Sequence, residues 1–164
     1  MAAEREPSFE VFFEAERDRL YGSLCLLTGD THDAEEIAQD AFLALWQRWR
    51  FVRTGAIGDP VGYLYRTAMN QFRTRLRRRR LAIRRSAAPT ESPDEWARAS
   101  ASRTVLGALA SLAPRQRAAI VLMELLDYSS EEAGRVLGVR AGTVRALAHQ
   151  GRTALRRAME DPDE

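Results

Sequence analysis

The chain has 164 residues, with 25 basic and 23 acidic side chains and a formal net charge of +2. That length is enough for one domain or for two small ones. Its single cysteine, Cys25, excludes a disulfide within the chain, and no cluster of cysteine and histidine is present for a zinc site. No apolar run is long enough to cross a membrane, and the acidic N-terminus is unlike a signal peptide. We therefore expect a cytoplasmic protein with no membrane insertion, no metal and no cofactor.

Two helices are predicted in the first part of the chain. Ser8 can cap the first, and Thr28-Gly29-Asp30 ends it. The second helix has apolar side chains at the spacing of one helical face, namely Ala34, Ile37, Ala38, Ala41, Phe42, Leu45, Trp46 and Trp49. Its other side is rich in acids, which gather in the first turns, where the helix dipole favours them. The composition leaves open whether these acids only stabilise the helix through its dipole or also form a surface for a partner.

A predicted loop from Arg50 to Gly58 has no helical period. The helix after it, Asp59–Arg85, opens with a capping aspartate and a proline at its first position. Between Tyr63 and Arg85 it carries nine arginines and no acid. Charged faces that only meet solvent usually mix both signs, so this helix is predicted to bind nucleic acid. Tyr65 lies on the apolar side and is expected in the core, whereas Tyr63 lies among the arginines and could stack on a base.

The fold class predicted is all-α, with two small helical domains joined by a flexible linker. The stretch 86–94, rich in alanine, serine and proline, is the predicted linker between domains at 1–85 and 95–164. A capping box at Ser92–Glu95 and a proline at Pro114 mark the starts of two helices in the second domain. The sequence has no strand pattern and no internal repeat.

The segment Ser129–Arg157 has the pattern of a helix, a glycine turn and a second helix. Ser129 and Glu132 form a capping box, Gly138 ends the first helix, and Ala141 is near the start of the second. A helix-turn-helix places its second helix in the major groove of DNA. The alternative is an ordinary helical hairpin at the end of a domain. The neighbouring arginine-rich helix favours DNA binding.

Three stretches of the chain together match a known family, and their order and spacing are more specific than any one of them. They are Asp33–Phe42 with Trp46, Asp59–Asn70, and Leu112–Arg117 followed by Ser129–Arg157. With these stretches, the chain resembles extracytoplasmic-function sigma factors, the compact two-domain branch of the bacterial sigma-70 family, from about Phe9 to Met159.

The resemblance implies three binding surfaces and no catalytic residue, because the polymerase performs the chemistry. It implies docking on the clamp helices of the largest subunit of core RNA polymerase through Asp33, Glu36, Gln39, Asp40, Leu43 and Gln47. It implies that the loop before the long helix holds a flipped base, and that −10 DNA is bound as a single strand by Arg53, Tyr63, Arg66, Asn70, Arg73, Arg77 and Arg80. It implies that the last helix binds double-stranded −35 DNA through Thr143, Arg145, Ala146, His149, Gln150, Arg152 and Thr153. An anti-sigma factor is a further partner that the resemblance implies.

The last helix departs from the family pattern at three positions. Leu147 and Gln150 stand where the family often has arginine, and Ala148 stands where it often has leucine. We expect Leu147 to take over the core packing of the missing leucine. Gln150 suits adenine recognition, and Arg145 and Arg152 are expected to contact phosphate.

Other functions remain open at this stage. One is a helix-turn-helix regulator that never joins polymerase, although such a protein has no need of the Asp33–Trp49 helix. An enzyme is a second, but His32 and His149 are far apart in sequence and no phosphate-binding glycine loop is present. A third is a degenerate sigma homologue that acts as a decoy.

Overall fold

The computed structural model describes residues 8–85 and 105–160, and every regular element in these ranges is a helix. The predicted all-α class is confirmed. In chain order the elements are α1 (Phe9–Thr28), α2 (Thr31–Trp46), α3 (Trp49–Arg53), α4 (Pro60–Arg85), α6 (Val105–Ser111), α7 (Pro114–Ile120), the π-helical turn η1 (Val121–Leu125), α8 (Ser130–Leu137) and α9 (Ala141–Glu160). The predicted linker 86–94 and the capping box at Ser92–Glu95 lie outside the described residues.

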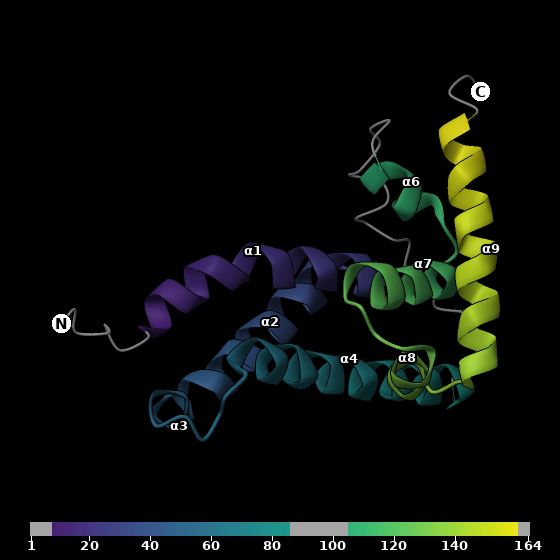
Figure 1. Ribbon diagram of the computed structural model, residues 1–164. Coiled ribbons are helices and arrows are strands. Elements are labelled where there is room, and N and C mark those ends of the chain that lie inside the picture. The colour runs from purple at the N-terminus through teal and green to yellow at the C-terminus, as the bar shows by residue number, and fades with distance from the viewer. Residues whose placement is uncertain (1–7, 86–104, 161–164) are drawn as a thin grey trace.

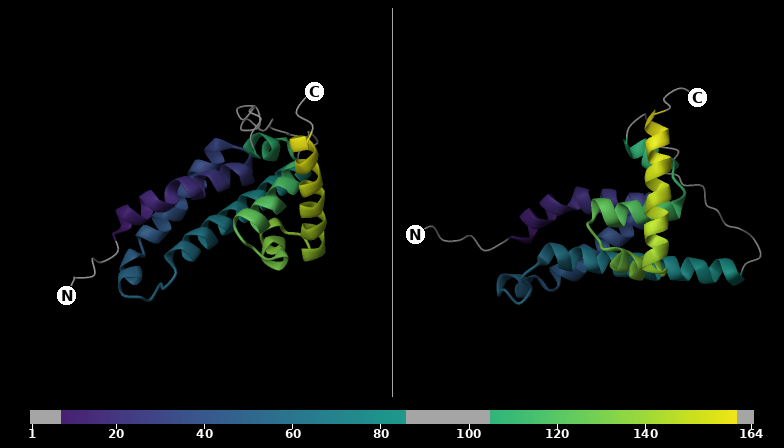
Figure 2. Two further views of the ribbon diagram at one scale, coloured as in Figure 1. Left: turned by 45° about the horizontal axis from the view of Figure 1, so that its top comes forward. Right: turned by 45° about the vertical axis from the view of Figure 1, so that its right-hand side comes forward.

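The helices form two groups that meet side by side. In the first group, α1 and α4 both pack on α2, as Figures 1 and 2 show. In the second group, α9 stands upright at one end of the molecule and packs against α7 and α8. We call these the N-terminal group and the C-terminal group. They touch where α8 lies on α4 and where α7 lies on the end of α1.

Local signals in the sequence set most of the helix ends. Gly29 and Gly138 both adopt a φ of 67°, a left-handed conformation that glycine takes without strain, and they end α1 and α8. The Asp59 carboxylate accepts a hydrogen bond of 2.8 Å from the Gly62 N–H and so caps α4. Ser129 and Glu132 form the predicted capping box of α8. These predictions are confirmed.

Two predictions about the second helix and the loop after it are wrong. The segment from Arg50 begins as helix, because α3 runs from Trp49 to Arg53. A single turn is too short to reveal a period in the sequence. Trp46 is 59% exposed, although the spacing put it on the buried face of α2. Helix α2 ends there, and Trp49 is buried from α3 instead, where its ring packs edge-on against Phe9 with the centroids 5.2 Å apart.

One cluster of buried side chains runs through both groups. It extends from Leu20 and Leu24 of α1, through Leu64 and Phe72 of α4, to residues of the C-terminal group that include Val144 of α9. The sequence predicted two small domains joined by a flexible linker. In this structure, apolar surface of each group is also buried against the other, which removes it from water.

Candidate functional site

The face of α2 that points away from the core combines polar and apolar side chains. Gln39, Asp40 and Gln47 are exposed, and Leu43 lies between them with 51% of its surface exposed. Trp46 lies one turn further along, so α2 presents two large apolar side chains beside an acid. Exposed apolar side chains within a polar rim are typical of protein-binding surfaces. We call Gln39, Asp40, Leu43, Trp46 and Gln47 the α2 surface.

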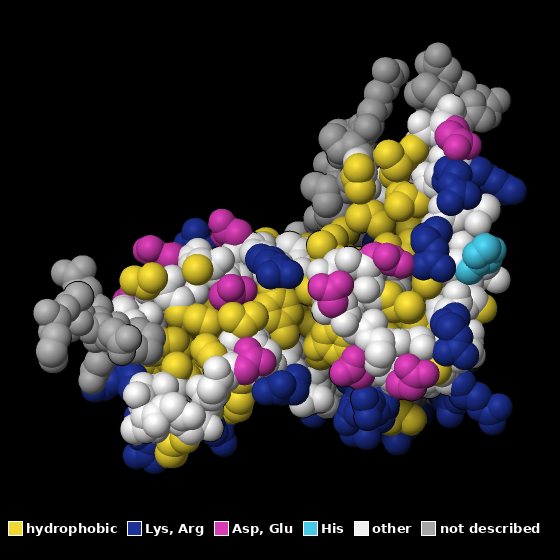
Figure 3. Space-filling model, viewed as in Figure 1, with side chains coloured by type: hydrophobic (Ala, Val, Ile, Leu, Met, Phe, Trp, Pro, Cys, Tyr) yellow, Lys and Arg dark blue, Asp and Glu magenta, His cyan; other side chains and the backbone are white. Residues whose placement is uncertain are grey.

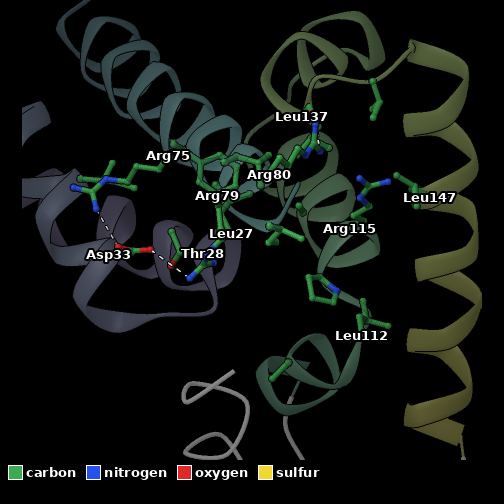
Figure 4. A pocket seen from close by; sticks show the side chains of 18 residues that line it. Leu27, Thr28, Asp33, Arg75, Arg79, Arg80, Leu112, Arg115, Leu137 and Leu147 are labelled. Atoms are coloured by element: carbon green, nitrogen blue, oxygen red, sulfur yellow. Dashed lines mark hydrogen bonds and ion pairs between the residues drawn. The ribbon is translucent and has the colours of Figure 1, made fainter. Parts of the chain in front are cut away.

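The two remaining acids of the predicted docking set belong to a contact inside the N-terminal group. The Arg75 guanidinium on α4 lies 3.0 Å from a carboxylate oxygen of Asp33 and 2.8 Å from one of Glu36. Arg79 adds a longer contact of 3.9 Å to Asp33. All of these side chains are partly buried or lie next to the cavity in Figure 4. The structure therefore separates Asp33 and Glu36 from the exposed residues of the predicted set.

The arginines of α4 lie on more than one side of the helix. Arg66, Asn70, Arg73 and Arg77 are exposed along one side, as their spacing predicted. Arg80 lies further along the same stripe, and its Nη2 donates a hydrogen bond of 2.9 Å to the Leu137 carbonyl oxygen of α8. We call the set Arg66, Arg73, Arg77 and Arg80 the α4 arginine stripe.

The two tyrosines of α4 differ in burial. Tyr65 is buried, as predicted, and its pKa is raised to about 12, chiefly by burial. The nearby charge of Arg19 lowers this pKa and that of Glu16 raises it, both by smaller amounts. Tyr63 lies one turn from Arg66 but is only half exposed, because it packs against the edge of the core. Its role in stacking on a base stays a prediction.

The segment between α3 and α4 is an exposed turn that is closed by main-chain contacts. The Ile57 N–H donates to the Phe51 carbonyl oxygen at 2.9 Å, and Gly55 has a φ of 77°, which a residue with a side chain adopts only under strain. Arg53 is exposed at the end of α3, at the start of this turn.

Helix α9 is divided into a buried stripe and an exposed side. Val144, Ala148 and Gly151 are buried, and a Cβ atom added at Gly151 would lie only 2.7 Å from Ile120 Cδ1. Leu147 does contribute to core packing, as expected, but it does not replace Ala148 there. Ala148 is fully buried itself, and Leu147 packs half-buried at the edge of the core. Of the predicted −35 residues, Thr153 is half exposed, and the exposed ones are Thr143, Arg145, Ala146, His149, Gln150 and Arg152.

The polar side chains of α9 contact neighbouring helices of the C-terminal group. Arg145 donates to the Ser130 hydroxyl at 2.9 Å, and Arg152 lies 2.6 Å from a Glu124 carboxylate oxygen. The Gln116 amide on α7 donates to the Gln150 side-chain oxygen at 3.4 Å. Figure 3 shows basic side chains following one another along the outer edge of α9. Such a row can meet the phosphates of a duplex.

Neither a metal centre nor a membrane span is found in the described part of the chain. No three side chains of His, Cys, Asp or Glu come together there in a way that could hold a metal ion. None of the helices in residues 8–85 and 105–160 is long and apolar enough to cross a membrane.

Comparisons with known proteins match both helix groups. Residues 12–82 match the family model for sigma-70 region 2, and residues 102–155 match the model for sigma-70 region 4. The RNA polymerase sigma-E factor of Streptomyces avermitilis is 31% identical over 94% of this chain and 87% of its own length. The chain belongs to the extracytoplasmic-function branch of the sigma-70 family. This sigma factor is 36% identical to the SigE factor of Mycolicibacterium smegmatis over 92% of this chain, which spans 61% of that longer protein.

The fold of this sigma factor also has a solved counterpart. The sigma factor RpoE of Bartonella quintana, in a crystal structure with the anti-sigma factor NepR, superposes with a TM-score of 0.55 over 93% of this chain and 96% of RpoE. At 19% identity this likeness concerns the fold alone.

The two family matches bear on one of the alternatives that the sequence left open. Region 2 coincides with α1 to α4, and region 4 covers α6 to α9, which include the helix-turn-helix. A regulator that never joins polymerase is not favoured, because the N-terminal group matches a sigma region. The chain is a sigma factor that directs RNA polymerase to promoters, and the proteins of this family are initiation factors.

Proposed function

We propose that this sigma factor docks on core RNA polymerase through the α2 surface, on the clamp helices of the largest subunit. Support comes from Leu43 and Trp46, two large apolar side chains that are exposed to solvent. The other face of the same helix is buried in the core. Aromatic side chains are enriched among the residues that dominate binding energy at interfaces. Asp40 beside them supplies a charge that can select a basic partner surface.

We further propose that α4 and the turn before it bind the opened −10 element. Separating a DNA duplex costs unpairing and unstacking. Cationic side chains offset this cost by neutralising phosphates, and an aromatic ring can stack on an exposed base. The α4 arginine stripe supplies the charge, and Tyr63 and Asn70 lie beside it on the same helix.

The last helix is proposed to read the −35 element as a duplex. The observation that carries this proposal is the inward stripe of Val144, Ala148 and Gly151, which leaves the opposite side of α9 exposed to a groove of DNA. Arg145 and Arg152 are the proposed phosphate contacts. Gln150 is the proposed base contact, because base edges differ from step to step and phosphates do not.

The remaining parts of the proposal concern partners and place of action. An anti-sigma factor is proposed as a regulator, by analogy with the relative solved with NepR. The chain itself is proposed to have no enzymatic activity and no cofactor, because polymerase performs the reaction. It is proposed to act in the cytoplasm, where polymerase and the chromosome are.

The direct test uses the full chain with purified core polymerase. We expect the two to co-elute from a sizing column, and the assembled complex to protect a −35 and a −10 segment from nuclease on DNA selected by that complex. A chain that protects DNA equally well without polymerase, and does not co-elute with it, would overturn the proposal in favour of a stand-alone regulator.

A further inference from the structure

Two glutamines from different helices meet at the exposed side of α9. Gln116 of α7 donates from its Nε2 atom to the Oε1 atom of Gln150, at 3.4 Å, across 34 positions of the chain. Gln116 is half-buried, whereas Gln150 is exposed. The contact therefore joins the proposed base-reading residue to a side chain that the packing of α7 already restricts.

The backbones of α7 and α9 are fitted to each other at this point. Gly151 follows Gln150, and a Cβ atom added there would lie 3.3 Å from both the Cβ atom and the carbonyl oxygen of Gln116. The missing side chain thus lets Gln116 lie directly beside α9. The next residue of α7, Arg117, is 2% exposed and donates from Nη1 to the Ala110 carbonyl oxygen at 3.1 Å. This buried bond fixes the chain next to Gln116.

The hydrogen bond decides which way the Gln150 amide faces. The last torsion of a glutamine side chain is broad and roughly two-fold, so an unheld amide exchanges its oxygen and nitrogen. The Oε1 atom has two lone pairs, and Gln116 uses one of them. The other lone pair and both N–H groups remain for DNA. Adenine presents an N6–H₂ donor beside the N7 acceptor in the major groove, which matches these remaining groups.

The charged side chains of α9 are suited to another task. Arg145 donates to the Ser130 hydroxyl at 2.9 Å, and Arg152 lies 2.6 Å from a Glu124 carboxylate oxygen. The proposed ligands of both arginines are phosphates, which are alike at every base pair. Discrimination among base pairs then falls to neutral polar groups, of which Gln150 is held by a second helix.

We propose that Gln116 is a positioning residue for promoter choice, which holds the Gln150 amide in the orientation that reads adenine in the −35 element. This inference rests on the proposed function of α9. Gln116 acts through Gln150 and need not touch DNA itself. Because the amide is oriented before DNA arrives, less side-chain freedom is lost when the base contact forms.

The test is binding-site selection with the holoenzyme, formed from core polymerase and the full chain, on a duplex library randomised across the −35 element. The parent should select adenine at one position, and Gln150→Ala should lose that selection. Gln116→Met has a similar length but no donor. It should reduce the preference for adenine at the same position by about threefold to tenfold, the cost of ordering one flexible side chain. Preferences elsewhere and the melting temperature should stay as they are.

Two further variants separate the hydrogen bond from the shape of the side chain. Gln116→Glu keeps the shape but cannot donate when ionised, so it should lose the same preference. Its added charge affects all sites alike, and the ratio between bases is the quantity compared. In a Gln150→Ala background, Gln116→Met should change the preference no further. Gln71→Met, at a half-buried glutamine of α4, is the control and should keep the parent motif.

The outcomes separate this inference from the proposed function. If Gln150→Ala relaxes one position and both Gln116 variants keep it, the positioning role is overturned and the reading of DNA by α9 stands. If the parent selects no −35 base at all, the proposed function of α9 fails, and this inference fails with it. Selection of a base other than adenine at the Gln150 position overturns the assigned orientation. A further loss from Gln116→Met in the Gln150→Ala background would make Gln116 a direct base contact instead.

Discussion

Arg75 of α4 lies with its Nη1 atom 2.8 Å from a carboxylate oxygen of Glu36 on α2. The pair fastens the two long helices of the N-terminal group to each other across the edge of the core. Glu36 is therefore engaged within the protein, whereas Asp40, one turn further along, is exposed. The two acids were predicted to have one role, and the structure gives them different surroundings.

Charge reversal at these two acids should have different consequences. Glu36→Arg should lower the free energy of unfolding by about 1 kcal/mol, which is roughly 2–4 °C in melting temperature, because it replaces a partly exposed ion pair with repulsion of Arg75. Asp40→Arg should leave the melting temperature unchanged and weaken binding to core polymerase. Calorimetry and a polymerase pull-down measure the two effects. Glu14→Arg, an exposed acid on α1, is the control. Equal polymerase affinity for Asp40→Arg and the parent would remove Asp40 from the docking surface.

The exposed apolar side chains of α2 give a second prediction. Trp46→Ala should weaken polymerase binding by about 2 kcal/mol, or roughly thirtyfold, because a large ring at the centre of an interface often dominates its energy. The melting temperature should hardly change, since Trp46 is already 59% exposed. Met159→Ala, at an equally exposed apolar residue of α9, should leave polymerase affinity as it is. Loss of stability instead of affinity in Trp46→Ala would mean that the ring supports the fold.

Two glycines allow a matched test of the packing between α7 and α9. Gly151→Ala should lower the free energy of unfolding by about 1–3 kcal/mol, because the new methyl group would lie 2.7 Å from Ile120 Cδ1 and 3.3 Å from the Gln116 carbonyl oxygen, a backbone atom that cannot move aside as easily as a side chain. Gly22→Ala in α1 places its methyl group with no atom within 4 Å and should raise stability by about 0.5–1 kcal/mol. Chemical denaturation measures both changes. A stable Gly151→Ala protein would show that α7 and α9 are less tightly packed than described.

The sequence predicted features that depend on neighbours along the chain. Asp59 with Pro60 and Ser129 with Glu132 specify helix starts by hydrogen bonds that reach only three residues, so local rules were sufficient. Gly138 specifies a helix end for a similar reason, because its left-handed φ is a property of one residue.

Features that depend on distant contacts were missed. Arg75 and Asp33 are 42 positions apart, so no spacing rule could pair them. Helical periodicity gave the direction of the buried face of α2 but not its width or its end, and Trp46 was therefore assigned to the core. The close approach of α7 to α9 at Gly151 also depends on how the helices pack, which a single sequence does not reveal.

The exposed side of α9 gives a prediction about promoter choice. Arg145→Ala should weaken −35 binding by a similar factor for all sequences and lower the salt slope by about one unit, because phosphates are alike at every step. Gln150→Ala should relax the preference at one base pair, at a cost of about 1–3 kcal/mol on the preferred sequence. Binding-site selection with the variant holoenzymes measures both. If Gln150→Ala keeps the parent motif and Arg145→Ala changes it, the two roles are reversed.

The most direct test of the account is run-off transcription with core polymerase on a library of promoter fragments. Core polymerase with the parent chain should start transcription at discrete sites that share a −35 and a −10 sequence. Core polymerase alone, or with the Trp46→Ala chain at limiting concentration, should produce few or none of these transcripts. Identical transcripts with and without the parent chain would contradict the account.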